Sequence, residues 1–461
     1  LEKTIKNIGK IAEDNKIAVY IVGGVVRDAL LNRPITDLDI VVIGDGIKFA
    51  ELVAKHFKIK TIIKYGKFGT AMIPMKNLTL ELTSARKEVY KTNSRKPEIT
   101  FTDLNEDLKR RDFTINSMAV DIRPSFFGDF FDPFNGIQDL KQKIIRTPLD
   151  AESTFFDDPL RMLRAIRFST QLNYEIDKTT FNGIINTADR INIISYERIR
   201  DELFKILSTA KPSIGLKLMD ESELMDILFP ELSALKGVEK KNGYFHKDVW
   251  KHTIEVVDNI TKYTDNPILR LIALFHDVGK PNTKRYKSNI GWTYYAHEDV
   301  GAKMFEKIGK RLKLSTKEIN YITKLIKLHL RPIAIASEKV TDSAVRRLMV
   351  DAGDDINDLL SLCRADITSK NEYKVKSFID NFNFVEQRII EVEERDKLRN
   401  FQSPVSGKEI MEIFNIKPGP IVGKIKSMIE SNILDGKIKN DYDATKSFIL
   451  NNKEYIIKNI L

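Results

Sequence analysis

The sequence predicts an α+β chain with a mixed β-sheet near its start and helices through the rest. Residues 17–150 alternate short β-rich runs with brief helical stretches, which is typical of a sheet covered by helices. From about residue 151 onward, apolar residues recur at helical spacing and no convincing strand pattern follows. The 461 residues leave room for about three or four structural units.

Composition narrows the class of protein. Hydrophobic residues make up 42% of the chain and charged residues 30%, so we expect a packed core and not a disordered chain. Cys363 is the one cysteine, which excludes a disulfide framework or multi-cysteine zinc site and favours a reducing compartment. No apolar stretch is long enough for a transmembrane helix, and residues 1–16 lack the apolar segment of a secretory signal. We therefore expect a cytoplasmic protein that does not cross a membrane.

The charge balance indicates an anionic partner. Lysine and arginine number 75 against 65 aspartates and glutamates, which gives a formal net charge of +10. An excess of this kind favours nucleic acid as the partner, with a membrane surface second.

A strand, a turn and a helix follow one another near the start of the chain. IAVYIV predicts the strand, Gly23-Gly24 the turn, and VVRDALL the start of the helix. Paired glycines let the backbone approach a phosphate closely, and Arg27 on the first helical turn adds a charge-assisted contact. A turn of this kind also occurs without any ligand, so the pattern alone leaves both interpretations open.

Two aspartates open the next predicted strand. Asp37 and Asp39 stand two residues apart before IVVIG, so their side chains point to the same face. Two carboxylates on one face of an apolar strand are unfavourable unless they bind a cation, and Mg²⁺ prefers such oxygen ligands. The alternative is a strand-entry turn in which both aspartates only cap loops.

Together, the Gly-Gly turn with its VRD and the D-x-D pair resemble the signature of DNA polymerase β-like nucleotidyltransferases. GGVVRDALLNRPITDLDIVV is similar to the class II branch, the tRNA CCA-adding enzymes and bacterial poly(A) polymerases. The resemblance implies a nucleotidyltransferase head with a mixed β-sheet, in which Asp37 and Asp39 are catalytic and hold Mg²⁺. It also implies nucleotide-binding roles for Gly23, Gly24 and Arg27.

LKRRDFTINSMAVDI resembles the second motif of this family, RRDFTxN. Arg110 or Arg111 is then the candidate for holding a triphosphate. Asp112 or Asn116 is the candidate for binding a ribose hydroxyl. A plain basic helix end is the alternative interpretation of this string.

DDPLRMLRAIRFS resembles the nucleobase-selecting motif of the family, with Asp157 in place of the usual glutamate. We expect Asp158 and Arg161 to share a helix face, with Arg164 and Arg167 continuing at the same spacing. Aspartate offers only acceptors and arginine only donors, so such a pair can meet the Watson–Crick edge of a base. The resemblance implies selection of CTP and then ATP without a nucleic-acid template, whereas a surface ion pair is the alternative.

SYERIRDELFKIL resembles the fifth family motif, S-x-E-R-x-x-x-E. Glu197, Arg198 and Glu202 are expected to form an ion-pair network that orients the nucleobase-selecting helix. We expect these three residues to have a structural role and to take no part in the reaction.

Glu81 lies on a predicted strand and is a candidate third carboxylate, or else an ordinary strand residue. The polar segment 91–100 lacks periodicity and predicts a mobile loop. In the family, enzymes that reach the terminal A keep a flexible loop here, so the resemblance favours addition of A.

Histidines gather in the predicted helical region. The series H…HD…D across four helices resembles the HD phosphohydrolase superfamily, although a lone helical histidine is more often an ordinary core or surface residue. Imidazoles and carboxylates suit Mn²⁺, Fe²⁺, Ni²⁺ or Zn²⁺, and a metal-bound water is a nucleophile near neutral pH. His246 is expected outside the ligand set. The expected ligands are His252, His276, Asp277 and Asp366, with His297 and His329 as a possible second site.

Both resemblances point to a CCA-adding tRNA nucleotidyltransferase that takes CTP and ATP and carries a possible additional HD phosphohydrolase activity. We expect a head at 1–147, a helical neck at 148–236, an HD domain at 237–375 and a tRNA-binding helical tail at 376–461. The alternatives are a bacterial poly(A) polymerase, an enzyme adding part of CCA, or an HD phosphohydrolase with an inactive head. The sequence leaves open the oligomeric state, the tRNA preference and the HD substrate.

Overall fold

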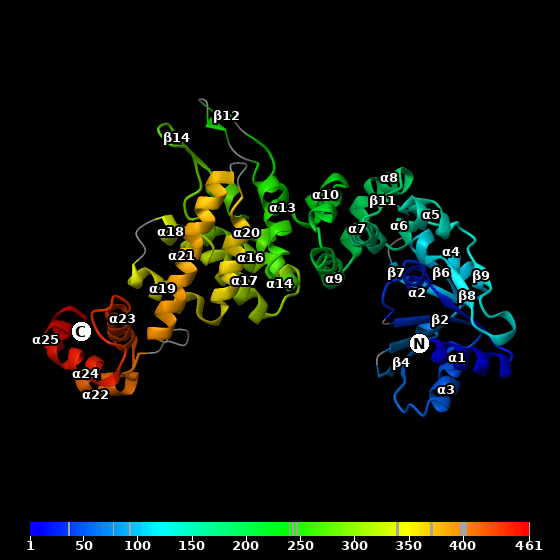
Figure 1. Cartoon of the computed structure of the whole chain (residues 1–461), viewed down its shortest axis with the longest axis horizontal. Coiled ribbons are helices and arrows are strands. Elements are labelled where there is room, and N and C mark those ends of the chain that lie inside the picture. Colours follow the sequence, from blue (N-terminus) through cyan, green and yellow to red (C-terminus); the bar gives the residue numbers. More distant parts are fainter. Residues whose placement is uncertain are drawn as a thin grey trace. The chain divides into compact units, whose positions relative to one another are not determined.

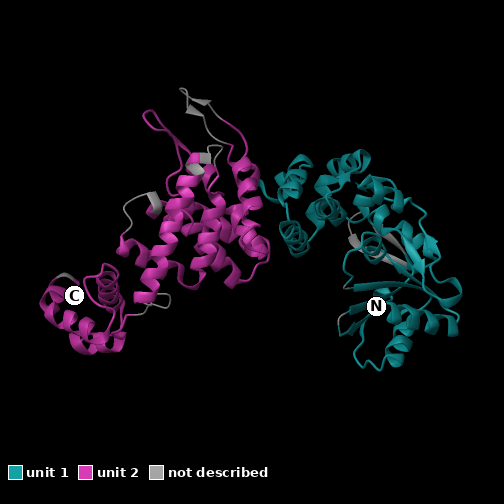
Figure 2. Ribbon diagram, in the orientation of Figure 1, with its two compact units in different colours: residues 1–230 teal, residues 231–461 magenta. Residues whose placement is uncertain are grey.

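The computed structural model divides the chain into two compact units, Leu1–Pro230 and Glu231–Leu461 (Figure 2). The first unit contains the large β-sheet and the second is built from helices, so the predicted α+β class is confirmed (Figure 1). The structure describes residues 1–35, 37–76, 78–91, 94–238, 240–241, 244–245, 248–337, 341–368, 372–396 and 403–460.

A seven-stranded mixed sheet forms the centre of the first unit. Its order is β3-β4-β5-β2-β1-β8-β9, and β2 and β5 are parallel neighbours while the other pairs are antiparallel. The strands are β1 (Ala18–Val22), β2 (Asp37–Ile43), β3 (Ile63–Tyr65), β4 (Thr70–Met75), β5 (Leu78–Ser84), β8 (Ala119–Asp121) and β9 (Phe130–Phe131).

Helices cover the sheet and continue beyond it to the end of the first unit. The helices of the first unit are α1 (Glu2–Asp14), α2 (Gly24–Leu30), α3 (Gly46–His56), α4 (Leu104–Lys109), α5 (Gly136–Gln142), α6 (Ala151–Asp157), α7 (Leu160–Leu172), α8 (Lys178–Thr187), α9 (Tyr196–Leu207), α10 (Ser213–Glu221) and α11 (Leu224–Leu228). Helices α1 and α3 pack against the sheet, and α7 packs against α9 and α10.

Alternation along β2 separates its two faces. Leu38, Ile40 and Val42 are fully or almost fully buried, because side chains at every second position point toward the helices on one face. Asp37 and Asp39 therefore point to the other face, as the spacing predicts.

Within the segment 91–100, predicted as a loop, the described residues 91 and 94–100 belong to paired β-strands. Strand β6 (Arg86–Lys91) pairs antiparallel with β7 (Ser94–Phe101), with an irregularity between Val89 and Lys91. Hydrophobic periodicity missed these strands because strand pairing uses backbone hydrogen bonds, which need no apolar alternation.

The second unit holds a helical body and a helical tail. Its helices are α13 (Val249–Ile260), α14 (Pro267–Phe275), α15 (Lys280–Thr283), α16 (His297–Arg311), α17 (Thr316–Leu328), α18 (Arg331–Ser337), α19 (Asp342–Ala352), α20 (Ile356–Asp366), α21 (Glu372–Asp396), α22 (Gly407–Phe414), α23 (Pro420–Leu434), α24 (Tyr442–Asn451) and α25 (Lys453–Ile460). Short strands β14 (Arg285–Lys287) and β15 (Gly291–Thr293) form a hairpin between α15 and α16.

The tail helices α22 to α25 enclose an apolar core of their own. The residues completely buried in it are Ile410, Ile425, Ile429, Ile449 and Ile456.

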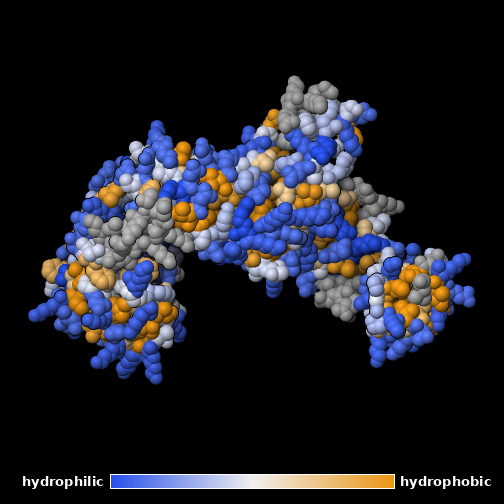
Figure 3. All heavy atoms as spheres, turned by 180° about the vertical axis from the view of Figure 1, so that it is seen from behind, coloured by the Kyte–Doolittle hydropathy of each residue, from blue (hydrophilic) through white to orange (hydrophobic). Residues whose placement is uncertain are grey.

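Hydrophilic residues cover most of the face of the molecule seen in Figure 3, with hydrophobic residues exposed in separate groups. Within the described ranges, no helix has both the length and the apolar character that crossing a membrane requires.

Gly9 in α1 supplies a first test of this packing. A Cβ atom there would lie 1.8 Å from the carbonyl oxygen of Ile122, just after β8. We expect Gly9→Ala to lower the stability of the first unit by about 1–3 kcal/mol through overpacking, measured by thermal unfolding. Gly423→Ala in α23 is the matched control, because nothing lies within 4 Å of its added Cβ and a stability gain of about 0.4–1 kcal/mol is expected. A Gly9→Ala chain as stable as wild type would contradict the close packing of α1.

Candidate functional site

Three carboxylates meet on the open face of the sheet. The parallel pairing of β2 with β5 puts Asp39 directly beside Glu81 and Asp37 beside Thr79. Adjacent residues of parallel strands point to the same face, so Glu81 joins the pair that the sequence predicts. Asp37 and Asp39 line a cavity of about 170 Å³, whose other lining residues are Gly24, Val25, Asp28, Pro34 and Ile35.

The electrostatics of this cavity fit a divalent cation. Burial and the neighbouring carboxylates Glu81 and Asp37 raise the pKa of Asp39 to about 6, against the opposing effect of Arg111 and Arg27. Ionisation of Asp39 is thus unfavourable unless a cation balances the negative charge of these carboxylates. Oxygen ligands converging in this way suit Mg²⁺, so the residues present fit the predicted ion.

The glycine turn brings arginine side chains beside the carboxylates. Gly23 has a φ of 72°, a conformation that favours glycine, and a Cβ there would lie 2.7 Å from Nη1 of Arg111. Arg27 on α2 is buried and donates from Nη1 to Oδ1 of Asn116 at 2.7 Å. Its Nε and Nη2 atoms donate to the two carboxylate oxygens of Asp28 at 3.0 and 2.8 Å.

Arg110 and Arg111 share one buried carboxylate, that of Asp107 on α4. Nη2 of Arg110 donates to Oδ1 at 2.6 Å, and Nη2 of Arg111 donates to Oδ2 at 3.0 Å. Burial would raise the pKa of Asp107, but Arg111 and Arg110 outweigh it and hold the pKa below its usual value. Our sequence analysis missed Asp107, although its i, i+3 and i+4 spacing to the two arginines was a usable signal.

Asp112 forms an ion pair with Arg164 of the predicted nucleobase-selecting helix. Nε and Nη2 of Arg164 donate to Oδ2 of Asp112 at 2.8 and 2.6 Å, while Nδ2 of Asn116 donates to Oδ1 at 3.0 Å. Burial acts against ionisation, yet Arg164 and Asn116 lower the pKa of Asp112 far below its usual value. The geometry makes Asp112 an anchor for Arg164, a contact that local spacing did not indicate.

Asp158 lies outside the helix on which the sequence analysis placed it. It ends α6 in an extended conformation (φ −134°, ψ 95°), and α7 begins only at Leu160. The reason is Pro159, because the residue before a proline is disfavoured in the α region. Asp158 lies 3.6 Å from Nη2 of Arg198, and Arg161 donates from Nη2 to the carbonyl oxygen of Arg110 at 2.6 Å.

Helix α9 holds α7 through a second ion pair. Nε of Arg167 donates to Oε2 of the buried Glu202 at 2.5 Å, and Lys205 donates to Oε1 of the same carboxylate at 2.9 Å. Glu202 thus pairs with Arg167, and Arg198 lies near Asp158, so two of the three residues expected in an ion-pair network contact the segment around α7. Among the described residues, no ion pair of the third, Glu197, accompanies them.

A larger cavity of about 950 Å³ lies between α2 and the neck helices. It shares Asp28 and Pro34 with the small carboxylate cavity, so the two are neighbours. Its basic lining side chains are suited to an anionic ligand. They are Arg27, Arg33, Lys205 and Lys211, accompanied by Phe168, Gln171 and Asn173.

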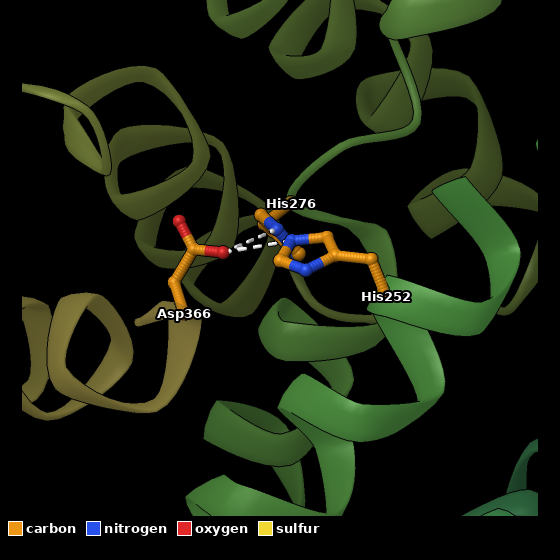
Figure 4. Close-up of side chains that lie close together, drawn as sticks. All are labelled: His252, His276 and Asp366. Carbon is orange, nitrogen blue, oxygen red and sulfur yellow. Dashed lines mark ion pairs between the residues drawn. The ribbon is translucent and has the colours of Figure 1, made fainter. Parts of the chain in front are cut away.

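All six predicted ligands of the helical body come together in the second unit. One group consists of His252, His276 and Asp366, whose Oδ1 lies 2.9 and 3.4 Å from the two Nε2 atoms (Figure 4). The second group consists of Asp277, His297 and His329, with Oδ1 of Asp277 at 3.3 and 3.8 Å from the Nε2 atoms. His246 lies outside the described residues.

Backbone carbonyl groups orient three of the four imidazoles. The Nδ1 atoms of His276, His297 and His329 donate to the carbonyl oxygens of Ala273, Tyr294 and Ile326 at 2.8, 2.8 and 2.6 Å. His252 is hydrogen-bonded through Nδ1 to Thr368 at 2.8 Å. These contacts turn every Nε2 toward the carboxylates, as metal-binding histidines require.

Buried polar atoms in this cluster lack hydrogen-bond partners among the described residues. They are Nε2 of His276, Nε2 of His297 and Oδ1 of Asp277. Burial lowers the pKa of His276, but Asp277 and Asp366 outweigh it and raise this pKa to about 10. A buried cluster that favours a bound positive charge and keeps free ligand atoms fits two metal ions.

Two residues of this cluster were missed by our sequence analysis as part of the site. Lys280 lies 2.5 Å from Oδ2 of Asp277, three residues on along the chain. Gly279 follows the His276-Asp277 pair by two residues, and a Cβ there would lie 2.1 Å from the carbonyl oxygen of His297. The close approach brings α15 against α16 and keeps both ligand-bearing segments together.

Comparisons with known proteins agree with this arrangement. Residues 19–146 match the Poly A polymerase head domain, 173–236 the probable RNA and SrmB-binding site of polymerase A, and 249–371 the HD domain. An A-adding tRNA nucleotidyltransferase of Deinococcus radiodurans is 30% identical over 74% of this chain and 78% of its own length. A CCA-adding enzyme of Leuconostoc mesenteroides is 29% identical over 96% of this chain and 94% of its own. The solved structure of a CCA-adding enzyme with CTP superimposes with a TM-score of 0.63 at 26% identity, covering 98% and 94% of the two chains.

The raised pKa of Asp39 predicts how the metal-free chain responds to pH. A carboxyl whose pKa is higher in the folded state favours folding while protonated, and this contribution is lost as pH rises through about 6. We therefore expect Asp39→Asn to raise the melting temperature in EDTA more at about pH 8 than at about pH 5. Thermal unfolding at both pH values tests this. Mg²⁺ should stabilise wild type more than the variant at the higher pH, and the opposite pH trend would contradict the assignment.

Gly279→Ala tests the geometry of the histidine cluster. The added Cβ forces α15 and α16 apart, so we expect metal affinity to fall by about tenfold or more. Metal content per chain is measured by elemental analysis after dialysis. Gly407→Ala is the matched control in the same unit, since its Cβ makes only an ordinary 3.5 Å contact with Val422. Unchanged metal content in Gly279→Ala would show that this contact does not shape the cluster.

Proposed function

The chain belongs to the family of tRNA nucleotidyltransferases and bacterial poly(A) polymerases, and on this basis we propose that it adds CCA to the 3′ end of tRNA. It does so by template-independent transfer of nucleotides from CTP and ATP. The observation that carries the proposal is the meeting of Asp37, Asp39 and Glu81 beside an arginine-lined cavity. Relatives named CCA-adding enzymes align with almost the whole chain, which supports it.

In the transfer step, the carboxylates concentrate negative charge where a cation is needed. Asp37 and Asp39 would hold Mg²⁺, with Glu81 as a third carboxylate beside them. When bound, the ions stabilise the attacking 3′ oxygen of the tRNA and the leaving pyrophosphate oxygen. Each addition forms one bond to the α-phosphorus of the nucleotide and releases pyrophosphate.

The arginines provide complementary positive charge. Arg110 and Arg111 are held by Asp107, so their guanidinium groups reach a triphosphate with little loss of side-chain freedom. Arg27, next to the turn formed by Gly23 and Gly24, acts with Arg111 on the carboxylate of Asp39. Fixed charges of this kind need no reorganisation during the reaction.

The nucleobase would be selected by Asp158, in the link between α6 and α7, and by Arg161 in the first turn of α7. Asp158 offers acceptors and Arg161 donors to the Watson–Crick edge of cytosine or adenine. Arg164 and Arg167 lie farther along the same helix and are held by Asp112 and Glu202. Asp112 pairs with Arg164, and Asn116 accepts a hydrogen bond from Arg27. Both candidates for the ribose contact are thus held in place by arginines, and either side chain would meet the ribose hydroxyl.

The tRNA would be bound through its phosphates. The 950 Å³ cavity with Arg33, Lys205 and Lys211 is a suitable place for the 3′ end, and the net charge of +10 favours the rest of the acceptor arm. The division into head, neck, HD domain and tRNA-binding tail at 1–147, 148–236, 237–375 and 376–461 forms part of this proposal. We also propose a cytoplasmic location, where tRNA is processed.

The histidine cluster would carry a separate phosphohydrolase activity. Imidazole and carboxylate ligands suit Mn²⁺, Fe²⁺, Ni²⁺ or Zn²⁺, and the two ligand groups can hold two such ions. When bound, the ions supply an activated water for attack on a phosphate ester. Lys280, beside Asp277, adds positive charge for the phosphate.

One alternative has specific support. The Deinococcus radiodurans relative is named an A-adding enzyme, so addition of only the terminal A is the second candidate function. An enzyme with an inactive head is disfavoured, because the three carboxylates and their arginines are all present.

Product ladders distinguish these functions. The purified chain is given tRNA ending at the discriminator base with CTP, with ATP, or with both. We expect CC from CTP alone and CCA from both nucleotides. Addition of A only to tRNA that already ends in CC would establish the A-adding alternative, and long tails from ATP alone would indicate a poly(A) polymerase.

Variants separate the two centres. Asp37→Ala is expected to lower nucleotide addition by about a thousandfold, the equivalent of several kcal/mol of lost metal stabilisation. His276→Ala should abolish metal-dependent hydrolysis of bis(p-nitrophenyl) phosphate and leave nucleotide addition within about twofold. Nucleotide addition that survives Asp37→Ala would refute the proposed mechanism.

A further inference from the structure

Phe168 on α7 lies against three arginines. Its ring centroid is 4.9 Å from Cζ of Arg27, 5.5 Å from Cζ of Arg164 and 4.0 Å from Cζ of Arg167. The side chain is 5% exposed and also packs edge-to-face on Phe113 at 5.8 Å. Each guanidinium is within the range of a cation–π contact, so one ring serves three cations.

Two of these arginines also belong to one polar chain. Arg27 donates to Asn116, Asn116 donates to Asp112, and Asp112 accepts both donors of Arg164. Arg27 comes from the phosphate side of the site and Arg164 from the nucleobase-selecting helix. Arg27 and Arg164 are therefore linked twice. One link is the series of hydrogen bonds through Asn116 and Asp112, and the other is their shared contact with the ring of Phe168.

Three guanidinium groups around one ring repel each other, and the structure balances them with carboxylates. Asp28 pairs with Arg27, Asp112 with Arg164 and Glu202 with Arg167. Each arginine is thus held from two directions, by a carboxylate on one side and by the ring on the other. The contact with the ring thus adds to each ion pair a second restraint on the position of the guanidinium group.

We propose that Phe168 is a positioning residue that holds Arg27 and Arg164 in one joint arrangement, coupling phosphate binding to nucleobase selection. The inference rests on the proposed nucleotidyl transfer. Phe168 touches neither the nucleotide nor the metal in this role. It acts through the two arginines, so losing the ring misplaces both of them at once.

The first test compares Phe168→Leu with Phe168→Tyr in the full chain on tRNA ending at the discriminator base or in CC. Leucine keeps apolar volume and removes the ring, so we expect KM for both CTP and ATP to rise about tenfold. Tyrosine keeps the ring and should stay within about twofold of wild type. A merely structural role would lower the active fraction, which reduces kcat and leaves KM unchanged.

Phe155→Leu is the matched control. Phe155 is a fully buried phenylalanine of the neighbouring helix α6, and no guanidinium lies over its ring among the residues that the structure describes. We expect this variant to lower the melting temperature and leave KM unchanged. If Phe168→Leu behaves in the same way, or if tyrosine fails to restore KM in a folded chain, the proposal is overturned.

A double-mutant cycle tests the coupling itself. Arg27→Lys and Arg164→Lys are measured singly and together in the wild-type chain and in Phe168→Leu. With the ring present, the combined loss in kcat/KM should differ from the product of the single losses by about fivefold. Without the ring this difference should fall to about twofold, because only the hydrogen-bonded chain through Asn116 and Asp112 still couples the two arginines. Equal coupling in both backgrounds would refute a role of the ring. A wild-type chain that adds no nucleotide at all would instead refute the proposed function.

Discussion

The parallel pairing of β2 with β5 is the contact on which the head depends. It sets Asp39 beside Glu81, so carboxylates crowd together on one face of an otherwise apolar sheet. The raised pKa of Asp39 expresses the resulting repulsion. Because the sheet fixes the distance between these groups, the repulsion cannot relax by movement of the strands. A cation and the surrounding arginines are the available sources of compensation.

The arginines that supply this compensation are themselves held by buried carboxylates. Asp107 anchors Arg110 and Arg111, and Asp112 anchors Arg164 across the junction of head and neck. Ionised pairs that are buried and hydrogen-bonded are strongly destabilised when one partner is removed. The same ion pairs fix the arginines and hold Arg164 of α7 to the segment after α4, which links folding of the first unit to the shape of its candidate site.

The second unit follows the same principle with softer ligands. The six side chains of its candidate metal site come from separate helical segments. The carboxylates of Asp277 and Asp366 favour a positive charge beside them, as the raised pKa of His276 shows. Carbonyl groups fix the ring nitrogens that face away from the centre. Each unit thus carries its own candidate cation site. Carboxylate oxygens form the one in the first unit, and imidazole nitrogens with carboxylate oxygens form the one in the second.

Features that depend on local spacing could be predicted from the sequence. Asp37 and Asp39 share a face because strand side chains alternate, and the paired glycines and the histidine series were visible as short motifs. Contacts between distant segments became visible only in the folded chain: Glu81 beside Asp39, Asp112 beside Arg164, and Phe168 against three arginines. The fold also places Asp158 off its expected helix and the described residues of segment 91–100 in paired strands. The physical reason is that periodicity reports the direction of a side chain along one element, whereas strand register and helix packing set its partners.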